Sequence, residues 1–216
     1  MAKEEYIWAI GDIHGHSLSL KAILEKIEQY NNKTLIFLGD YIDRGPNPKE
    51  VLDIIMSLNN KIALMGEHEY LLLSSLEGEQ QKPEIILEWS KYGYETTLKD
   101  FEASDVESLN KNLDAKYKDF LQSLAIFHTE KFSSSKKDFD LLFSHAGPFP
   151  DIPLSEQLNI KNFKDYNSFL ESKRLGILMV VCLIMIKFFK RAFQHGIIIF
   201  LFMVIFAHNI VRIVID

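Results

Sequence analysis

The chain has 216 residues, of which 47% are hydrophobic and 25% charged, and its net charge is −6. This length suffices for one domain with a substantial core, while the negative charge argues against nucleic acid as a partner. The single cysteine, Cys182, cannot form an intramolecular disulfide, and the N-terminus lacks the pattern of a secretory signal, so we expect a cytoplasmic protein.

Short apolar runs alternate with helical patterns in the first part of the chain. The predicted strands are Tyr6–Ile10, Thr34–Leu38 and Lys61–Met65, and the predicted helices are Ser17–Tyr30, Pro48–Leu58 and Glu67–Leu76. Within the first helix, for example, Leu20, Ile23, Leu24 and Ile27 have the spacing of one helix face. The alternation predicts an α/β fold with parallel strands.

The middle of the chain, residues 82–124, has a mostly helical pattern. Two further strands, Leu124–Phe127 and Phe139–Phe143, are predicted around a polar turn, and a proline-containing loop follows the second. No internal repeat or low-complexity linker precedes residue 173. We therefore expect one domain over residues 1–172.

Four of the predicted strands end in a segment that carries Asp, Glu or His. These segments are Gly11-Asp12-Ile13-His14-Gly15, Gly39-Asp40-Tyr41-Ile42-Asp43-Arg44-Gly45, Gly66-Glu67-His68-Glu69 and Ser144-His145-Ala146-Gly147. Glycine permits the unusual backbone angles and close approach that a tight ligand site needs. Ligands of α/β folds collect beyond the carboxyl ends of the strands, and mixed carboxylate and imidazole groups suit divalent cations. The pattern therefore predicts a metal site at this edge of the sheet.

The order of these segments resembles that of the calcineurin-like metallophosphoesterases. Within them it resembles the phosphoprotein phosphatases, in particular the bacterial serine/threonine protein phosphatases, whose motifs run GDxHG, GDxxDRG, GNHE and a later His-Gly-type segment. The resemblance covers roughly Ile7 to Pro153. It implies a four-layer β-sandwich flanked by helices, whose C-terminal part would be incomplete here.

The resemblance also implies a dinuclear metal site. Asp12 and His14 would hold the first metal, Asp40 would bridge both, and Glu67 and His145 would hold the second. The expected cofactors are two divalent ions, with Mn²⁺ first and Fe, Zn or Mg as alternatives. A bridging carboxylate is needed because two like charges must be held close together.

Three further residues would carry out the chemistry that the resemblance implies. A metal-bridging hydroxide would attack a phosphoserine or phosphothreonine ester. Arg44 would hold the phosphate oxygens, for which a guanidinium fork is well shaped. His68 would protonate the leaving group, and Asp43 would orient His68. These residues could instead be surface charges or helix caps. That alternative would make the full set of motifs a coincidence.

The sequence departs from the family pattern at two places. Glu67 stands where the family has Asn, and its extra negative charge should reduce the Lewis acidity of the second metal. The family also has a later Gly-His-Thr segment, preceded by a Trp and an Arg, which is not recognisable here. His208 is the best candidate for that metal-binding His, and His195 is a weaker one.

The C-terminal segment, residues 173–216, differs in composition from the rest. Residues 1–172 carry 18 Lys and Arg against 29 Asp and Glu, whereas residues 173–216 carry 6 against 1. Two apolar runs, Leu175–Ile186 and Gly196–Ala207, flank a basic stretch, and each is shorter than the roughly 20 residues of a bilayer span. We expect an atypical tail that is a truncated or altered end of the same domain. A buried strand pair, a frame-altered sequence and contact with a membrane surface are the alternatives.

Three functions remain open at this point. The first is a metal-dependent phosphatase acting on phosphoproteins. The second is a hydrolase of dinucleoside tetraphosphates or another small phosphate ester. The third is a non-catalytic relative that binds metal or a phosphoprotein, which Glu67 and the tail would favour.

Overall fold

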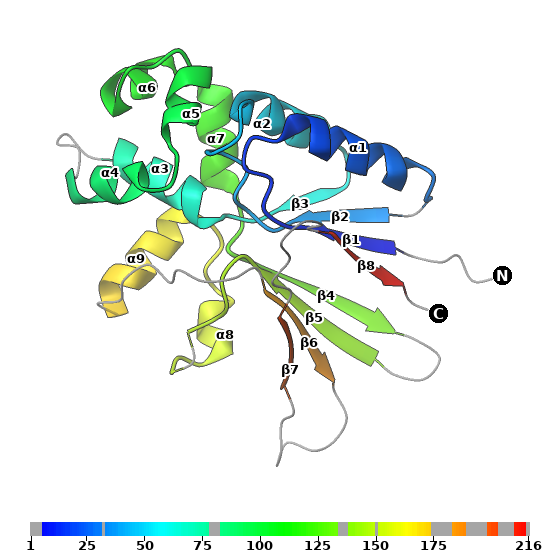
Figure 1. The fold of residues 1–216 in the computed structure, drawn as a ribbon. Coiled ribbons are helices and arrows are strands. Elements are labelled where there is room, and N and C mark those ends of the chain that lie inside the picture. Colours follow the sequence, from blue (N-terminus) through cyan, green and yellow to red (C-terminus); the bar gives the residue numbers. More distant parts are fainter. Residues whose placement is uncertain are drawn as a thin grey trace.

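A computed structural model of the chain describes residues 6–31, 33–77, 83–133, 138–149, 151–173, 183–188, 198–202 and 210–214. Figure 1 shows the arrangement of the elements. The strands are β1 (Tyr6–Ile10), β2 (Lys33–Phe37), β3 (Lys61–Ala63), β4 (Phe127–Ser133), β5 (Asp138–Ser144), β6 (Leu183–Phe188), β7 (Ile198–Phe202) and β8 (Ile210–Val214). The helices are α1 (Ser17–Glu28), α2 (Pro48–Ser57), α3 (Glu67–Leu76), α4 (Pro83–Ser90), α5 (Glu95–Asp100), α6 (Val106–Asn112), α7 (Ala115–Ser123), α8 (Leu154–Gln157) and α9 (Phe163–Lys173).

The first sheet has the strand order β3-β2-β1-β8. Strands β1, β2 and β3 are parallel, whereas β8 is antiparallel to β1. The carboxyl ends of the three parallel strands therefore meet at one edge of the sheet. The loops that begin at Gly11, Leu38 and Leu64 leave from that edge.

Alternate residues of the first sheet pack into two separate cores. Ile10 and Phe37 belong to the core that the sheet shares with the helices, including α1 and α2. Ile7, Ala9 and Ile36 belong instead to the core between the two sheets. Because side chains alternate along a strand, both faces of this sheet are buried, which accounts for its continuous apolar runs.

The second sheet is antiparallel, with the order β4-β5-β6-β7. Phe143 of β5 faces the first sheet, and its neighbour Leu142 packs against Leu154 and Leu158 at α8. The layers are thus helices, sheet, sheet and helix (Figure 1). The predicted α/β architecture with two sheets and flanking helices is confirmed.

One predicted strand is placed wrongly by the sequence pattern. The pattern predicts a strand at Leu124–Phe127, but β4 begins only at Phe127. Ala125 forms a bridge with Leu64, next to β3, before the chain reaches the second sheet. The segment that crosses from the first sheet to the second needs apolar side chains, as a strand does. The apolar pattern therefore does not distinguish this segment from the start of β4.

Three short strands come from residues 173–216. β6 pairs with β5 in the second sheet, and β8 pairs with β1 in the first. Cys182, His195 and His208 lie outside the described residues. Within the described part of the chain, none of the helices has the length and apolar character needed to cross a bilayer.

The pairing of β8 with β1 predicts a specific cross-link. Ala9 and Val211 are directly opposite, and such pairs place their Cβ atoms about 4.5–5.5 Å apart. In a Cys182→Ser background, Ala9→Cys with Val211→Cys should therefore form a disulfide on mild oxidation, measured by mass spectrometry of linked peptides. Ala9→Cys with Arg212→Cys is the control, because adjacent residues of a strand face opposite sides of the sheet. Equal yields in the two pairs would contradict this register.

Candidate metal and catalytic site

Four residues in the loops after β1 and β2 have a backbone that non-glycine residues rarely adopt. The φ angles are 44° at His14, 55° at Asp40, 67° at Asp43 and 65° at Arg44. Such angles cost roughly 1–3 kcal/mol each and persist only where the surrounding structure enforces them. All four residues belong to the segments that the sequence predicts to form the site. The strain therefore marks the same edge of the sheet.

Glycines bring the backbones of neighbouring loops into direct contact. A Cβ atom on Gly66 would lie 2.2 Å from the backbone nitrogen of Asp40. A Cβ atom on Gly39, whose φ is 109°, would lie 2.5 Å from Gly66. No side chain fits at either position. The loops after β2 and β3 thus approach each other closely enough to share one site.

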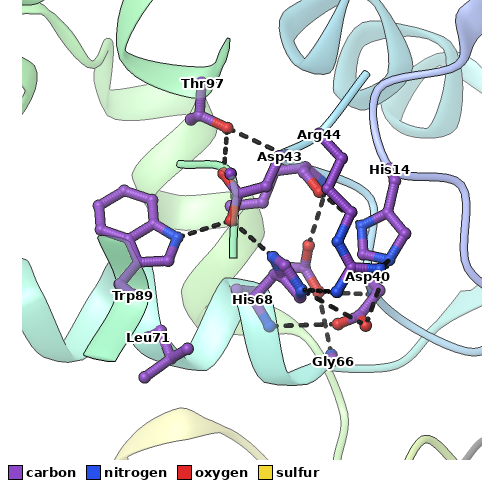
Figure 2. A network of polar contacts seen from close by, with 12 residues as sticks. His14, Asp40, Asp43, Arg44, Gly66, His68, Leu71, Trp89 and Thr97 are labelled. Carbon is purple, nitrogen blue, oxygen red and sulfur yellow. Dashed lines mark hydrogen bonds and ion pairs between the residues drawn. The ribbon is translucent and has the colours of Figure 1, made fainter. Parts of the chain in front are cut away.

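The Asp40 carboxylate lies at the centre of the site. The Nε2 atoms of His14, His68 and His145 lie 3.8, 4.0 and 3.5 Å from its Oδ2 atom. Figure 2 shows Asp40 beside His14 and His68. Three imidazole nitrogens from three different loops therefore converge on one buried carboxylate oxygen.

Two of these rings are oriented through their other nitrogen. Nδ1 of His14 donates to the carbonyl of Ile42, and Nδ1 of His145 donates to the carbonyl of Leu38, both at 3.0 Å. In the neutral form of either ring, Nε2 therefore carries the lone pair and faces Asp40. Metal-binding histidines are commonly held in this way by a backbone carbonyl, so both rings fit a metal ion.

The charges at the site oppose one another. Burial alone would raise the pKa of Asp40, but the imidazoles, led by His145, lower it below its ordinary value. Burial lowers the pKa of His14, although Asp40 acts in the opposite direction. A neutral imidazole and an ionised carboxylate are the protonation states that bind metal.

The ligating atoms form two close groups that share Asp40. One group contains Asp12, Asp40 and His145, and the other contains His14, Asp40 and His68. The structure thus brings together four of the predicted metal ligands and also places His68 beside them. A set of imidazole nitrogens and carboxylate oxygens around one shared carboxylate could hold divalent cations.

Glu67, the first residue of α3, lies at the edge of this cluster. It lines a pocket with His145 and the aromatic side chains of Tyr70, Phe127 and Phe149. Its Oε1 atom is buried and accepts no hydrogen bond from the described residues. Burial and the charge of Asp40 raise the pKa of its carboxyl group. A bound cation would satisfy this oxygen, so Glu67 also fits the predicted metal site.

Asp43, Arg44 and His68 form the other half of the site (Figure 2). Nδ1 of His68 lies 2.6 Å from Oδ2 of Asp43. Nη1 of Arg44 lies 2.8 Å from Nε2 of His14, and its Nη2 atom lies 3.3 Å from Nε2 of His68. Burial lowers the pKa of His68, but the hydrogen bond to Asp43 and the charge of Asp40 raise it above its ordinary value.

Three polar residues that hold the site together are not evident from the sequence. Nε1 of Trp89 donates to Oδ2 of Asp43 at 2.6 Å, and Oγ1 of Thr97 donates to the other oxygen of Asp43. These contacts span 46 and 54 residues of sequence, so no local pattern announces them. The third residue, Glu69, belongs to the segment Gly66-Glu67-His68-Glu69, but the sequence pattern predicts no role for its side chain.

Glu69 is fully buried and ties two loops together. Its Oε2 atom accepts from the backbone nitrogens of Asp40 at 2.8 Å and Gly66 at 3.0 Å. Its Oε1 atom accepts from Tyr41 at 2.8 Å and Ile42 at 3.3 Å. Burial and Asp40 raise the pKa of Glu69 to about 7, while the N–H of Tyr41 acts in the opposite direction. Both oxygens face only donors, so an amide cannot replace the carboxylate.

Two isosteric substitutions on the same helical turn should therefore differ in effect. Glu69→Gln turns an NH₂ group toward backbone N–H donors and should lower the free energy of unfolding by about 2–4 kcal/mol. Glu67→Gln should lower it by less than about 1 kcal/mol, because Oε1 of Glu67 accepts no hydrogen bond from the described residues. Urea unfolding in a chelating buffer measures both. Similar losses in the two variants would show that Glu69 does not hold the loops.

The chain is similar in sequence to several known proteins. It is 37% identical over 67 residues to a symmetrical bis(5'-nucleosyl)-tetraphosphatase of Coxiella burnetii, covering 31% of this chain and 23% of that protein. It is 37% identical over 75 residues to serine/threonine-protein phosphatase 2 of Escherichia coli, covering 33% of each chain. The chain spans about half or less of the length of the curated relatives that it matches.

A solved structure of a mutant cold-active protein tyrosine phosphatase shares the fold. Its TM-score is 0.50 at 18% identity, and the match covers 82% of this chain and 52% of that one. The family model described as calcineurin-like phosphoesterase matches residues 6–202, which include β1 to β7. This match covers most of the chain and includes all four segments that form the site. The chain belongs to the calcineurin-like phosphoesterase family.

Proposed function

We propose that this protein hydrolyses the phosphomonoesters of phosphoserine and phosphothreonine in proteins, with two divalent cations as cofactors and Mn²⁺ as the expected metal. One observation carries the proposal. Three imidazole Nε2 atoms surround the Asp40 carboxylate, and one of these rings is also hydrogen-bonded to Asp43 and lies beside Arg44. The proposed proton donor, His68, thus lies next to the proposed cation site around Asp40.

The proposed metal ligands are Asp12, His14, Asp40, Glu67 and His145, with His208 as a further candidate outside the described residues. Bound divalent cations would lower the pKa of a water molecule and neutralise charge on the phosphoryl group. Asp40, which belongs to both groups of ligating atoms, is the natural residue to be shared between two ions. Its ionised state, favoured by the three imidazoles, suits that role.

His68 is the proposed proton donor. In its charged form, the ring gives the proton on Nε2 to the leaving oxygen of the alcohol. Asp43 accepts from Nδ1, which stabilises the imidazolium and raises the pKa of His68. Arg44 is exposed and beside His68, so its guanidinium can turn to bind two phosphate oxygens.

The substrate class rests on the comparison with relatives. Similarity to the Escherichia coli serine/threonine phosphatase supports a phosphoprotein substrate. Similarity to the Coxiella burnetii tetraphosphatase supports a second candidate, hydrolysis of dinucleoside tetraphosphates. The aromatic pocket beside Glu67 and His145 could accept a nucleobase, which favours keeping that candidate.

The purified protein should hydrolyse an aryl phosphate and a phosphoserine peptide when Mn²⁺ is added, and chelation should abolish both activities. His68→Gln should lower kcat for the peptide by about 10²–10⁴. His128→Gln should leave it unchanged, because His128 is paired with Glu130 on β4 and belongs to neither group of ligating atoms. Faster hydrolysis of diadenosine tetraphosphate than of the peptide would favour the second substrate class. A folded protein without turnover on any substrate would favour a non-catalytic binding role.

Replacement of Glu67 should change the affinity for the metal ions and their Lewis acidity, but it should not abolish metal binding. Glu67→Asn removes one negative charge, so it should weaken Mn²⁺ binding severalfold and raise kcat severalfold once the site is saturated. Isothermal titration calorimetry measures the affinity for Mn²⁺, and steady-state kinetics measures kcat. Glu84→Asn, which removes an exposed charge from α4, is the charge-matched control. Unchanged Mn²⁺ affinity in Glu67→Asn would show that the negative charge of Glu67 does not strengthen metal binding.

A further inference from the structure

The carboxylate of Asp43 is held by three buried side chains. Trp89 and His68 contact its Oδ2 atom, each at 2.6 Å, and Thr97 donates to Oδ1. Asp43, Trp89 and Thr97 are each 0% exposed, and His68 is 1% exposed. Figure 2 shows that Trp89 and Thr97 approach the carboxylate from the side away from Arg44 and His14. No water is needed to satisfy either oxygen.

The segment from α4 to α5, which carries Trp89 and Thr97, also holds the backbone around Asp43. The N–H of Asp43 donates to Oγ1 of Thr97 at 3.0 Å, so this hydroxyl contacts both the backbone and the carboxylate of one residue. The N–H of Arg44 donates to the carbonyl of Gly93 at 3.1 Å. These contacts support the strained backbone at Asp43 and Arg44.

The geometry fixes the direction of the hydrogen bond to His68. With Thr97 on one oxygen and Trp89 on the other, the carboxylate cannot rotate without losing a buried hydrogen bond. Its remaining lone pair on Oδ2 then faces Nδ1 of His68. The opposite nitrogen of that ring, Nε2, lies 4.0 Å from Oδ2 of Asp40, on the side of the metal ligands.

We propose that Trp89 and Thr97 are positioning residues for proton donation by His68, so that the helical segment from α4 to α5 contributes to protonation of the leaving group. This inference rests on the proposed function. A packing role is the alternative, because Trp89 belongs to the core and stacks edge-on against Tyr94. Packing alone, however, does not require the polar atoms of both residues to meet on one carboxylate.

Leaving-group dependence separates the two roles. Phenol is a poor leaving group that needs a proton, whereas 2,4-dinitrophenolate leaves without one. Thr97→Val keeps the shape of the side chain and Trp89→Phe keeps an aromatic ring, and each removes the hydrogen-bond donor. Each should slow phenyl phosphate hydrolysis about 10–100-fold and 2,4-dinitrophenyl phosphate hydrolysis by less than about threefold.

Conservative and distant substitutions complete this test. Thr97→Ser keeps the hydroxyl and should return phenyl phosphate hydrolysis to within about threefold of the parent rate. Trp8→Phe, on β1, should leave the ratio of the two rates unchanged. Equal slowing of both esters in Thr97→Val and Trp89→Phe, or no rescue by Thr97→Ser, would overturn the inference in favour of packing.

A measurement without metal or substrate tests the contact itself. The chain has two tryptophans, so Trp8→Phe leaves one indole N–H signal, that of Trp89, in a nitrogen-15 correlation spectrum. A carboxylate acceptor should place this signal at low field, and Asp43→Asn should move it upfield. No movement would overturn the inference even if the protein proved inactive. Absence of turnover in the parent protein, with the signal shifted as expected, would count against the proposed function alone.

Discussion

The carboxylate of Glu69 joins the loop after β2 to the start of α3, and the position of Asp40 depends on it. Four backbone N–H groups converge on this one side chain. Any of them left unpaired in the interior would cost roughly 1–3 kcal/mol. Gly66 and Asp40 are in such close contact that no side chain fits at position 66. Asp40, at the centre of the site, is thus held through its backbone N–H by the carboxylate of Glu69.

The strained backbone of the site is supported by neighbouring loops rather than by the loops themselves. The carbonyl of Asp40 accepts from the N–H groups of both Ile13 and His14 at 2.9 Å. The carbonyl of His14 in turn accepts from Gly45 at 2.9 Å. His14 and Asp40 are therefore each supported by the loop that follows the other strand. Asp43 and Arg44 are supported by Thr97 and Gly93. Such mutual support pre-organises a site, since the cost of ordering is met during folding and not during binding.

The sequence was informative where chemistry and local structure coincide. The predicted strand Tyr6–Ile10 and helix Glu67–Leu76 have the observed bounds, and the polar segments after β1, β2, β3 and β5 do converge. Trp89 and Thr97 could not be predicted, because their roles depend on how α4 and α5 pack beside Asp43. Both residues lie on short helices, and the sequence around them does not distinguish a contact with Asp43 from ordinary core packing.

The segment from residue 173 shows the limit of composition as a guide. Its long apolar runs differ from the preceding sequence, yet strands buried on both faces also read as continuous apolar runs. β8 covers the edge of β1, and β6 covers the edge of β5, so both sheets gain strands from this segment. An uncovered edge of β1 would present unpaired backbone groups beside the loop that carries Asp12 and His14. The strand that leads into this loop is therefore paired, on one side, with a strand far away in the sequence.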